Sequence, residues 1–579
     1  MSKYDLFLLH PPAVYDFRER SIFYGPVSDV VPSTPIFEMY PFGFTTMANH
    51  LHKRGYKVRI ANLASMMLND RKFDVERFIS KMDSMVFGID LHWLPHAHGA
   101  LEVAKLVKRI HPDSKVLMGG FSSTYFHQEL LGYPQVDYIL RGDSTEIPLC
   151  DLMDHLEKGL PLDDVPNLSW KDGGRHRHNP MTFIPEDLDY MDIDYGWMIR
   201  SVIRYRDMKG FKPWKDWDQN PLTVIIPVKG CSLNCVECGG SCYAMRKFLG
   251  RERPAFRSPE KVAEDLYNIQ CYLKAPTFIV GDIRLAGDRW AERLLTEARK
   301  LGVNNHVAFE LFRPAGEDLF GMMERNLEGF SIEMSPDSHD ENVRKMLGRS
   351  YTNQAMEATI RKALDKGCER FDIFFMIGLP GQDRDNAMAS SEYCRHLFQM
   401  LDNDRRLIPY TAPLAPFLDP GSLAFENPEK YGYRVLARTL EEHRVRLTNP
   451  SWKRVLSYET EWLDRDGIAE TSYDAADLLN QVRFDCDQID REEFEDRANR
   501  TANARDLMER LDLVLDIDDL EERESGLAIL REEGYALMES TICQKRELEW
   551  KTRGAFMNAP RVVLGLLRPK RRSNSGADN

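Results

Sequence analysis

Four of the ten cysteines in this 579-residue chain lie between positions 231 and 242, in the stretch GCSLNCVECGGSC. Cys231, Cys235 and Cys238 have the spacing C-x3-C-x2-C and follow an apolar run that predicts a strand. Gly230 precedes them and allows the backbone to turn tightly. The first residues, MSKYDLFLLHPPAV, show no secretory signal. Clustered thiols in such a chain indicate metal or redox chemistry rather than disulfides.

The number and spacing of these thiols favour an iron–sulfur cluster over a zinc ion. A structural zinc site normally takes four ligands, and the sequence has no second CxxC pair to complete one. The four-cysteine spacings of ferredoxins are absent as well. Three thiolates on one loop can hold three irons of a 4Fe-4S cluster and leave the fourth iron open for a ligand. Cys242 is then expected to be a spare thiol.

The cysteine loop belongs to an alternation of predicted strands and helices between about residues 221 and 420. The predicted strands are LTVIIPV, TFIVGD, HVAFELF, GFSIEM, RFDIFFMIG and LIPYTAPL. We expect an α/β unit, a partial (β/α)6 barrel of the TIM type, in which reactive groups lie on the loops after the strands. The cysteines occupy the first such loop.

This arrangement resembles the radical S-adenosylmethionine superfamily. The resemblance implies a 4Fe-4S cluster on Cys231, Cys235 and Cys238, with S-adenosylmethionine bound at the open iron. The chain departs from the usual pattern at Glu237, where most members carry an aromatic residue before the third cysteine.

Three later segments resemble the family's contacts with S-adenosylmethionine. IVGDIR resembles the segment that receives the amino group, SIEMSPDSH the segment at the ribose, and FFMIGLPGQ the motif near the adenine. A carboxylate in the first segment suits an ammonium group, and an arginine in the helix after the second is a candidate for the carboxylate of the ligand. The implied contacts are Gly281, Asp282, Glu333, Ser335, Arg344, Ile377 and Gly378.

Residues 1 to 158 also alternate apolar runs with amphipathic stretches, which predicts a parallel sheet with helices on both faces. We expect a doubly wound, Rossmann-like domain. Ligands of such folds lie outside the carboxyl ends of the strands. The loops after Leu9, Ile89, Met118 and Leu140 are therefore expected to form a site.

A Rossmann-like domain ahead of a radical barrel resembles the cobalamin-binding class B radical S-adenosylmethionine methylases. MGGFSSTYF has paired glycines that allow close backbone approach to the cobalamin tail, and RGDSTEIPL resembles an acidic segment of the family. DLHWLPHAHG begins like a cobalt-ligating motif, but it follows the third strand and has proline where that motif needs glycine. We expect this loop to touch the corrin or to cap the next helix. The implied cobalamin contacts are Asp90, His92, Gly119, Gly120, Ser122, Gly142 and Asp143.

Two other regions complete the predicted organisation. Residues 159–220 read as a linker with a hairpin, NLSWKDGGRHRHNP, and residues 421–579 as a helical C-terminal domain rich in charge. The stretch GAFMNAPRVVLGLLRPKRR combines apolar and basic residues, and it predicts either a plain helix or one on an anionic membrane surface.

Charge and hydropathy limit the classes of partner that we expect for this protein. A net charge of −14 disfavours nucleic acid as a partner, and no apolar run is long enough to span a bilayer. We expect a cytoplasmic protein. The resemblance implies a reductant such as flavodoxin or ferredoxin and a small-molecule, lipid or peptide substrate.

The activity implied by the resemblance is methyl transfer to an unactivated carbon. A 5'-deoxyadenosyl radical would abstract hydrogen, and methylcobalamin would deliver the methyl group. Three alternatives stay open: cyclisation, rearrangement or oxidation without methyl transfer, a sensor in which cluster and cobalamin only signal redox state or light, and a Rossmann domain that has lost cobalamin.

Overall fold

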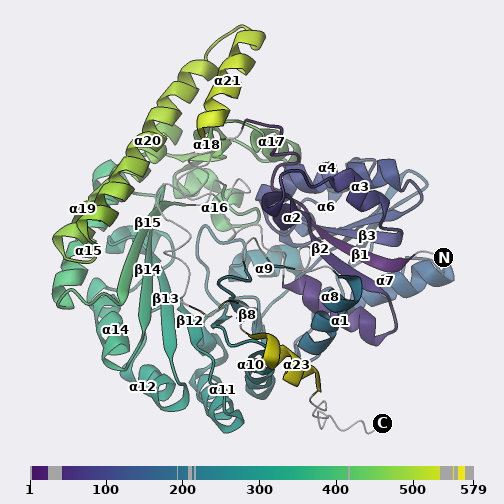
Figure 1. Ribbon diagram of the computed structural model, residues 1–579, viewed down its shortest axis with the longest axis horizontal. Coiled ribbons are helices and arrows are strands. Elements are labelled where there is room, and N and C mark those ends of the chain that lie inside the picture. The colour runs from purple at the N-terminus through teal and green to yellow at the C-terminus, as the bar shows by residue number, and fades with distance from the viewer. Residues whose placement is uncertain are drawn as a thin grey trace.

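The computed structural model describes residues 3–21, 23, 42–191, 193–206, 212–213, 217–414, 417–534, 552, 554 and 558–567 (Figure 1). Two α/β units lie side by side, and long helices extend from the second unit (Figure 1). Among the helices described, none combines the length and the apolar content that crossing a membrane requires.

The first unit is a sheet in the order β2-β1-β3-β4-β5-β6-β7. Its parallel strands are β1 (Tyr4–His10), β2 (Val58–Asn62), β3 (Ser84–Asp90), β4 (Lys115–Gly119) and β5 (Tyr138–Leu140). Successive side chains of a strand point to opposite faces. In β1, Leu6 and Leu8 therefore pack with α1 (Gly43–Lys53) and α7 (Glu146–Lys158), whereas Phe7 and Leu9 pack with α4 (Ala97–Ile110). Helices on both faces confirm the predicted Rossmann-like fold.

The predicted hairpin belongs to this sheet rather than to a separate linker. β6 (Leu168–Asp172) pairs antiparallel with β5, and β7 (Arg175–His178) pairs with β6. Gly173 and Gly174 have φ of 53° and 82° in the turn, as a tight hairpin turn requires. Burial of Leu168 and Trp170 in the core of the first unit is the physical reason for the difference.

The second unit is a six-stranded parallel sheet in the order β8-β11-β12-β13-β14-β15. The strands are β8 (Thr223–Ile225), β11 (Thr277–Ile279), β12 (Val307–Leu311), β13 (Phe330–Asp337), β14 (Arg370–Ile377) and β15 (Leu407–Pro413). The covering helices include α10 (Pro259–Tyr272), α11 (Asp288–Leu301), α12 (Glu317–Asn326), α14 (Asn353–Asp365) and α15 (Arg384–Met400). β8 and β15 end the sheet without pairing with each other, so the barrel is partial.

The C-terminal region is mostly helical and covers one edge of the barrel. α19 (Arg465–Asp485) packs on α15 and on β15, the edge strand. α20 (Arg491–Leu515) and α21 (Leu520–Gly534) form a hairpin that extends away from the body (Figure 1). A small antiparallel pair, β16 (Tyr433–Val435) and β17 (Tyr458–Thr460), was not predicted.

Candidate functional site

The two units meet where loops of the first sheet contact the segment after the cysteines. α5 (Phe121–Tyr125), which follows β4, packs on α9 (Cys242–Leu249). The ring of Tyr125 lies 5.0 Å from that of Phe248 and 5.8 Å from that of Phe425. The carboxyl ends of the first sheet and the cysteine loop therefore share one interface.

The cysteine loop is fixed by a glycine turn and by hydrogen bonds to two other segments. Gly230 turns the chain with a φ of 85°. The amide of Val236 donates to the carbonyl of Leu347 (3.1 Å), and the amide of Gly239 donates to Asp419 Oδ2 (2.8 Å). Because Asp419 follows β15, the last strand of the barrel positions a loop that follows the first.

The three predicted ligand thiols lie close enough to influence one another. Partial burial raises the pKa of Cys231 and Cys235, and the proximity of Cys235 raises the pKa of Cys231 further. Backbone amides donate to two sulfurs, from Leu233 to Cys231 Sγ (3.3 Å) and from Gly240 to Cys238 Sγ (3.3 Å). Amide donors to sulfur are a means by which proteins tune iron–sulfur clusters.

The donors that this loop offers are thiol sulfurs, which are the usual protein ligands of iron–sulfur clusters. Within the described ranges, no three His, Cys, Asp or Glu side chains converge as ligands of one metal ion. A cubane would take each thiolate on a different iron. Cys242 begins α9, and its sulfur lies 3.9 Å from Arg246 Nη2.

The loops after β3 and β4 approach each other closely at Gly120. Its φ is 112°, and a Cβ there would lie 2.4 Å from the Cα of His92. The carbonyl of His92 accepts hydrogen bonds from the amide (3.2 Å) and the hydroxyl (3.1 Å) of Ser122, and the carbonyl of Gly119 accepts one from Leu91 (2.9 Å). These predicted cobalamin contacts therefore lie together on adjoining loops.

His92 and Asp90 are held in different ways. The Asp90 carboxylate lies 2.9 Å from Nδ1 of His10, and both side chains are buried. The ring of His92 lies 4.9 Å from that of Phe121, and burial lowers its pKa to about 4. His92 is therefore a neutral imidazole at pH 7.

Asp143 forms an ion pair between the two units. Its carboxylate accepts two hydrogen bonds from Arg251 (2.5 and 2.9 Å), and the side chains are 4% and 2% exposed. Arg251, which follows α9, also donates to the carbonyl of Pro185 (2.9 Å). The Asp143 carboxylate thus has a protein partner within the predicted cobalamin segment, and its contact with cobalamin stays a prediction. Gly142, with a φ of 112°, remains at the end of β5 and donates to Thr124 Oγ1 (3.0 Å).

The interior of the barrel carries a row of acids on adjacent strands. Glu310 of β12 pairs in register with Glu333 of β13, which pairs with Asp372 of β14. Burial, with Asp372 and Glu310 nearby, raises the pKa of Glu333 to about 8. Burial raises the pKa of Asp372 to about 6 against the opposing effect of Arg370, which donates to both its oxygens at 2.9 Å.

Glu310 was missed by the sequence reasoning. Its carboxylate accepts a hydrogen bond from the amide of Gly281 (2.7 Å). The signal was present, because Glu310 has the same place in HVAFELF as Glu333 has in GFSIEM.

Asp282 and Arg344, two of the predicted ligand contacts, have protein partners. Asp282 is 2% exposed, and Arg284 donates to both its oxygens (2.8 and 2.5 Å). Arg344 is fully buried and donates to the carbonyls of Ser338 (2.7 Å) and Tyr351 (3.0 Å). Both charges therefore have protein partners, and their contacts with S-adenosylmethionine stay predictions.

Arg349 is a second arginine at the predicted ribose segment, and the sequence reasoning did not name it. Its guanidinium pairs with Asp337 (2.7 Å) and donates to the carbonyl of Ser335 (2.5 Å). Burial raises the pKa of Cys235, and the charge of Arg349 opposes that rise, so Arg349 stands beside both the cysteine loop and the predicted ribose segment. The sequence offers two arginines five positions apart, and only tertiary contacts distinguish them.

The end of β14 faces aromatic residues from the C-terminal region. Ile377 is buried in their cluster, and Gly378, with a φ of 92°, leaves room for the hydroxyl of Tyr458, which lies 2.9 Å from an ideal Cβ. That hydroxyl is buried and has no hydrogen-bond partner within the described part of the chain. Tyr433 donates to Glu237 Oε1 (3.4 Å). Aromatic packing near Glu237 therefore comes from β16 and β17.

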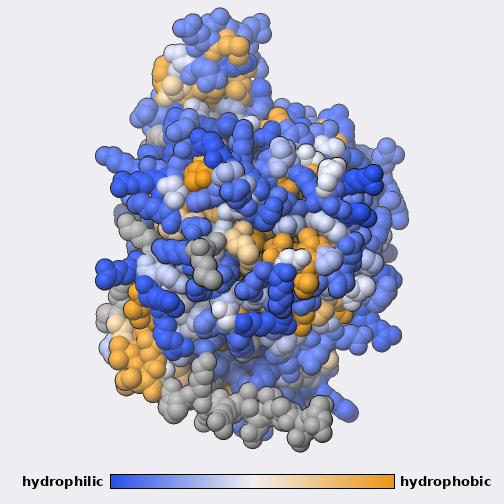
Figure 2. Space-filling model, turned by 90° about the vertical axis from the view of Figure 1, so that its right-hand side faces the viewer, coloured by the Kyte–Doolittle hydropathy of each residue, from blue (hydrophilic) through white to orange (hydrophobic). Residues whose placement is uncertain are grey.

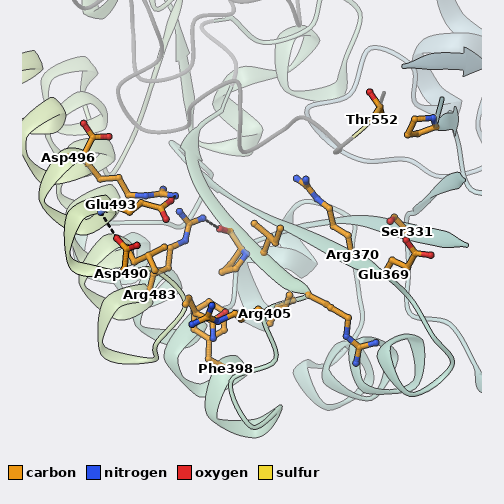
Figure 3. A pocket seen from close by; sticks show the side chains of 18 of the residues that line it. Ser331, Glu369, Arg370, Phe398, Arg405, Arg483, Asp490, Glu493, Asp496 and Thr552 are labelled. Atoms are coloured by element: carbon orange, nitrogen blue, oxygen red, sulfur yellow. Dashed lines mark hydrogen bonds and ion pairs between the residues drawn. The ribbon is translucent and has the colours of Figure 1, made fainter. Parts of the chain in front are cut away.

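A cavity of about 2180 Å³ opens at the opposite end of the barrel (Figure 3). Its lining includes Ser331, Glu369, Arg370, Arg405 and Arg483. None of the predicted cofactor contacts lines it. The ion pair of Arg370 with Asp372 connects the lining of this cavity to the row of acids.

Two parts of the chain match known families. Residues 29–148 match the B12 binding domain, and residues 225–394 match the radical SAM superfamily. A curated relative, the uncharacterized methyltransferase PH0819 of Pyrococcus horikoshii, is 22% identical over 339 residues, which cover 56% of this chain and 67% of the relative.

Solved structures share the fold at low sequence identity. The radical S-adenosylmethionine methyltransferase TsrM of Kitasatospora setae, with cobalamin and a [4Fe-4S] cluster bound, matches with a TM-score of 0.53 and 14% identity over 75% of this chain and 81% of that one. The cobalamin-dependent S-adenosylmethionine radical enzyme OxsB, with aqua-cobalamin bound, matches with a TM-score of 0.52 and 12% identity over 97% and 80%.

Proposed function

Because the chain joins a B12 binding domain to a radical SAM domain, we propose that it is a methyltransferase acting on an unactivated carbon. The cofactors are cobalamin, a 4Fe-4S cluster and S-adenosylmethionine. The observation that carries the proposal is the interface of α5 with α9. It sets the predicted cobalamin loops beside the cysteine loop, and the chemistry needs both cofactors near one substrate carbon.

In this proposal, each of the two units binds a different part of the cofactor set. Cys231, Cys235 and Cys238 would hold the cluster. The adjoining loops with Asp90, His92, Gly119, Gly120, Ser122 and Gly142 would hold cobalamin, and the positions for S-adenosylmethionine are Gly281, Glu333, Ser335, Ile377 and Gly378, to which we add Arg349. When bound, these groups supply reductive cleavage of S-adenosylmethionine, hydrogen abstraction from carbon and a transferable methyl group.

The protein's part is to orient the substrate and keep water out. Tyr125, Phe248 and Phe425 form an aromatic contact at the interface of the units. At the other end, Arg370 pairs with Asp372 and donates to the Tyr410 hydroxyl (2.9 Å). A closed reaction space protects reactive species from solvent.

Glu333 holds a proton at neutral pH. Its pKa of about 8 results from burial and from Asp372 and Glu310. A neutral carboxylic acid can donate a hydrogen bond as well as accept one. This property suits the predicted contact with ribose hydroxyls.

The test uses full-length protein reconstituted anaerobically with iron, sulfide and hydroxocobalamin. With a chemical reductant, S-adenosylmethionine carrying a labelled methyl group, and a small-molecule extract, we expect 5'-deoxyadenosine and a labelled product. The Cys231→Ala variant should form neither, whereas Cys242→Ala should form both.

Other outcomes select among the alternatives. Formation of 5'-deoxyadenosine together with an unlabelled product would contradict methyl transfer and support a cyclisation, rearrangement or oxidation. No 5'-deoxyadenosine under several reductants would support a sensor. A protein that retains no cobalt after reconstitution has lost the cobalamin site.

A further inference from the structure

The last described helix, α23 (Ala559–Leu567), presents apolar side chains to solvent. Val563, Leu564 and Leu567 are 56%, 64% and 75% exposed. Their spacing places them on one face of the helix. Figure 2 shows the apolar surface at the lower left of the molecule, where α23 lies.

The opposite face of α23 is already packed on the protein. A Cβ on Gly565 would lie 2.7 Å from the ring of Tyr272, the last residue of α10. Arg561 donates to the carbonyl of Gln270 (2.7 Å), and Asn558 Oδ1 accepts from the amide of Lys274 (2.9 Å). The helix is therefore anchored with its exposed stripe pointing away from the body. Contiguous exposed apolar surface of this kind marks an interaction site.

Basic residues adjoin the stripe in the sequence, although the chain as a whole is acidic. The sequence continues with Arg568, Lys570, Arg571 and Arg572, which lie outside the described residues, while the net charge of the chain is −14. Arg561 donates to an oxygen of Gln270, and Lys274 donates to oxygens of Asn304. Because these acceptors are neutral, the hydrogen bonds do not neutralise the two positive charges. An apolar stripe next to basic residues matches an anionic lipid surface, which offers an acyl boundary and negative headgroups together.

We propose that α23, with the basic residues that follow it, docks this protein onto an anionic lipid bilayer. Its nine residues extend about 14 Å, so the helix lies on the surface and does not span the membrane. Lys274 and Arg561 also line the large cavity, so docking would place that cavity beside the bilayer. The proposal does not depend on the proposed function.

The experiment is co-sedimentation of the full-length protein with vesicles of phosphatidylglycerol and phosphatidylcholine, compared with phosphatidylcholine alone. We expect binding to the anionic vesicles that weakens as salt is raised, because salt screens the basic residues. Leu564→Glu should reduce the partition coefficient at least about tenfold, because it removes an apolar contact and adds a repelled charge. Lys570→Glu with Arg571→Glu tests the charge separately and should also weaken binding.

A matched control is Leu513→Glu on α20, since Leu513 is 71% exposed on a helix far from α23 (Figure 1). This variant should bind as the unmodified protein does. Thermal melting shows that each variant is folded. The proposal is overturned by equal binding to neutral vesicles, by absence of binding, or by a dimer that Leu564→Glu dissociates without any effect on vesicles. The last result would make the stripe an interface between two copies.

Discussion

Asn in place of Asp143 should destabilise the protein rather than weaken cobalamin binding directly. Arg251 and Asp143 are buried, with side chains 2% and 4% exposed and joined by two hydrogen bonds. Removing one member leaves an uncompensated charge in the interior, which costs about 3–5 kcal/mol. We therefore expect a loss of that order in the free energy of unfolding for Asp143→Asn.

The assay is urea unfolding of the cofactor-free chain, followed by fluorescence, with midpoints compared among variants. Asp143→Asn combined with Arg251→Met should recover most of the loss, because the second substitution removes the unpaired charge. The control is Glu252→Gln, which breaks the exposed pair of Arg246 with Glu252 (2.8 Å; 57% and 72% exposed). An exposed pair contributes at most about 1 kcal/mol.

One result would refute this reasoning. If Asp143→Asn leaves the midpoint unchanged but abolishes binding of hydroxocobalamin, the carboxylate contacts the cofactor as the sequence first indicated. Cobalt content after gel filtration, measured on the same samples, separates the two explanations.

Three further predictions concern the cluster, a loop and acid stability. Alanine at Cys231, Cys235 or Cys238 should abolish the iron content and the cluster absorbance of protein reconstituted with iron and sulfide alone, whereas Cys242→Ala should leave both unchanged. Loss of iron in Cys242→Ala would contradict the assignment of three ligands. Gly120→Ala should lower the melting temperature and the cobalt content, since its Cβ would overlap His92, whereas Gly132→Ala, with nothing within 4 Å, should be neutral. Burial lowers the pKa of His443 from 6.5 to about 4, with Arg446 acting in the same direction and Glu442 against it. As the pH falls, the unfolded chain takes up a proton at His443 before the folded chain does. The contribution of His443 to the free energy of unfolding is therefore fully present above pH 6.5 and is lost toward pH 4, by up to roughly 3 kcal/mol. His443→Gln should flatten that decline, and an unchanged pH profile of the melting temperature would show that His443 does not cause it.

The sequence predicted the two sheets because strand formation leaves a local pattern. Each parallel strand of the barrel is an apolar run bounded by turn residues, and such a run can be recognised without its neighbours. The hairpin of β6 and β7 was found for the same reason. Its addition to the first sheet was not, because the edge that a strand joins depends on burial of Leu168 and Trp170 against distant residues.

The parts of the candidate site that depend on backbone conformation could be predicted from the sequence. Gly120 and Gly142 both have positive φ at strand ends, and glycine in such a position is visible in the sequence. The partners of charged side chains were harder to predict, because the sequence around a carboxylate does not show whether it binds a ligand or an arginine. Asp143, Asp282 and Arg344 all have protein partners that come from tertiary contact or local turns.

The ion pair between the units also has a consequence for how the protein is made. Asp143 and Arg251 are 108 positions apart, and at the rates typical of ribosomes this distance takes about 5–20 s to synthesise. During that interval the first unit of the nascent chain lacks both Arg251, the partner of Asp143, and the second unit that later packs against it. The two units can therefore dock only late in synthesis, and the loop at Asp143 is exposed to solvent until then.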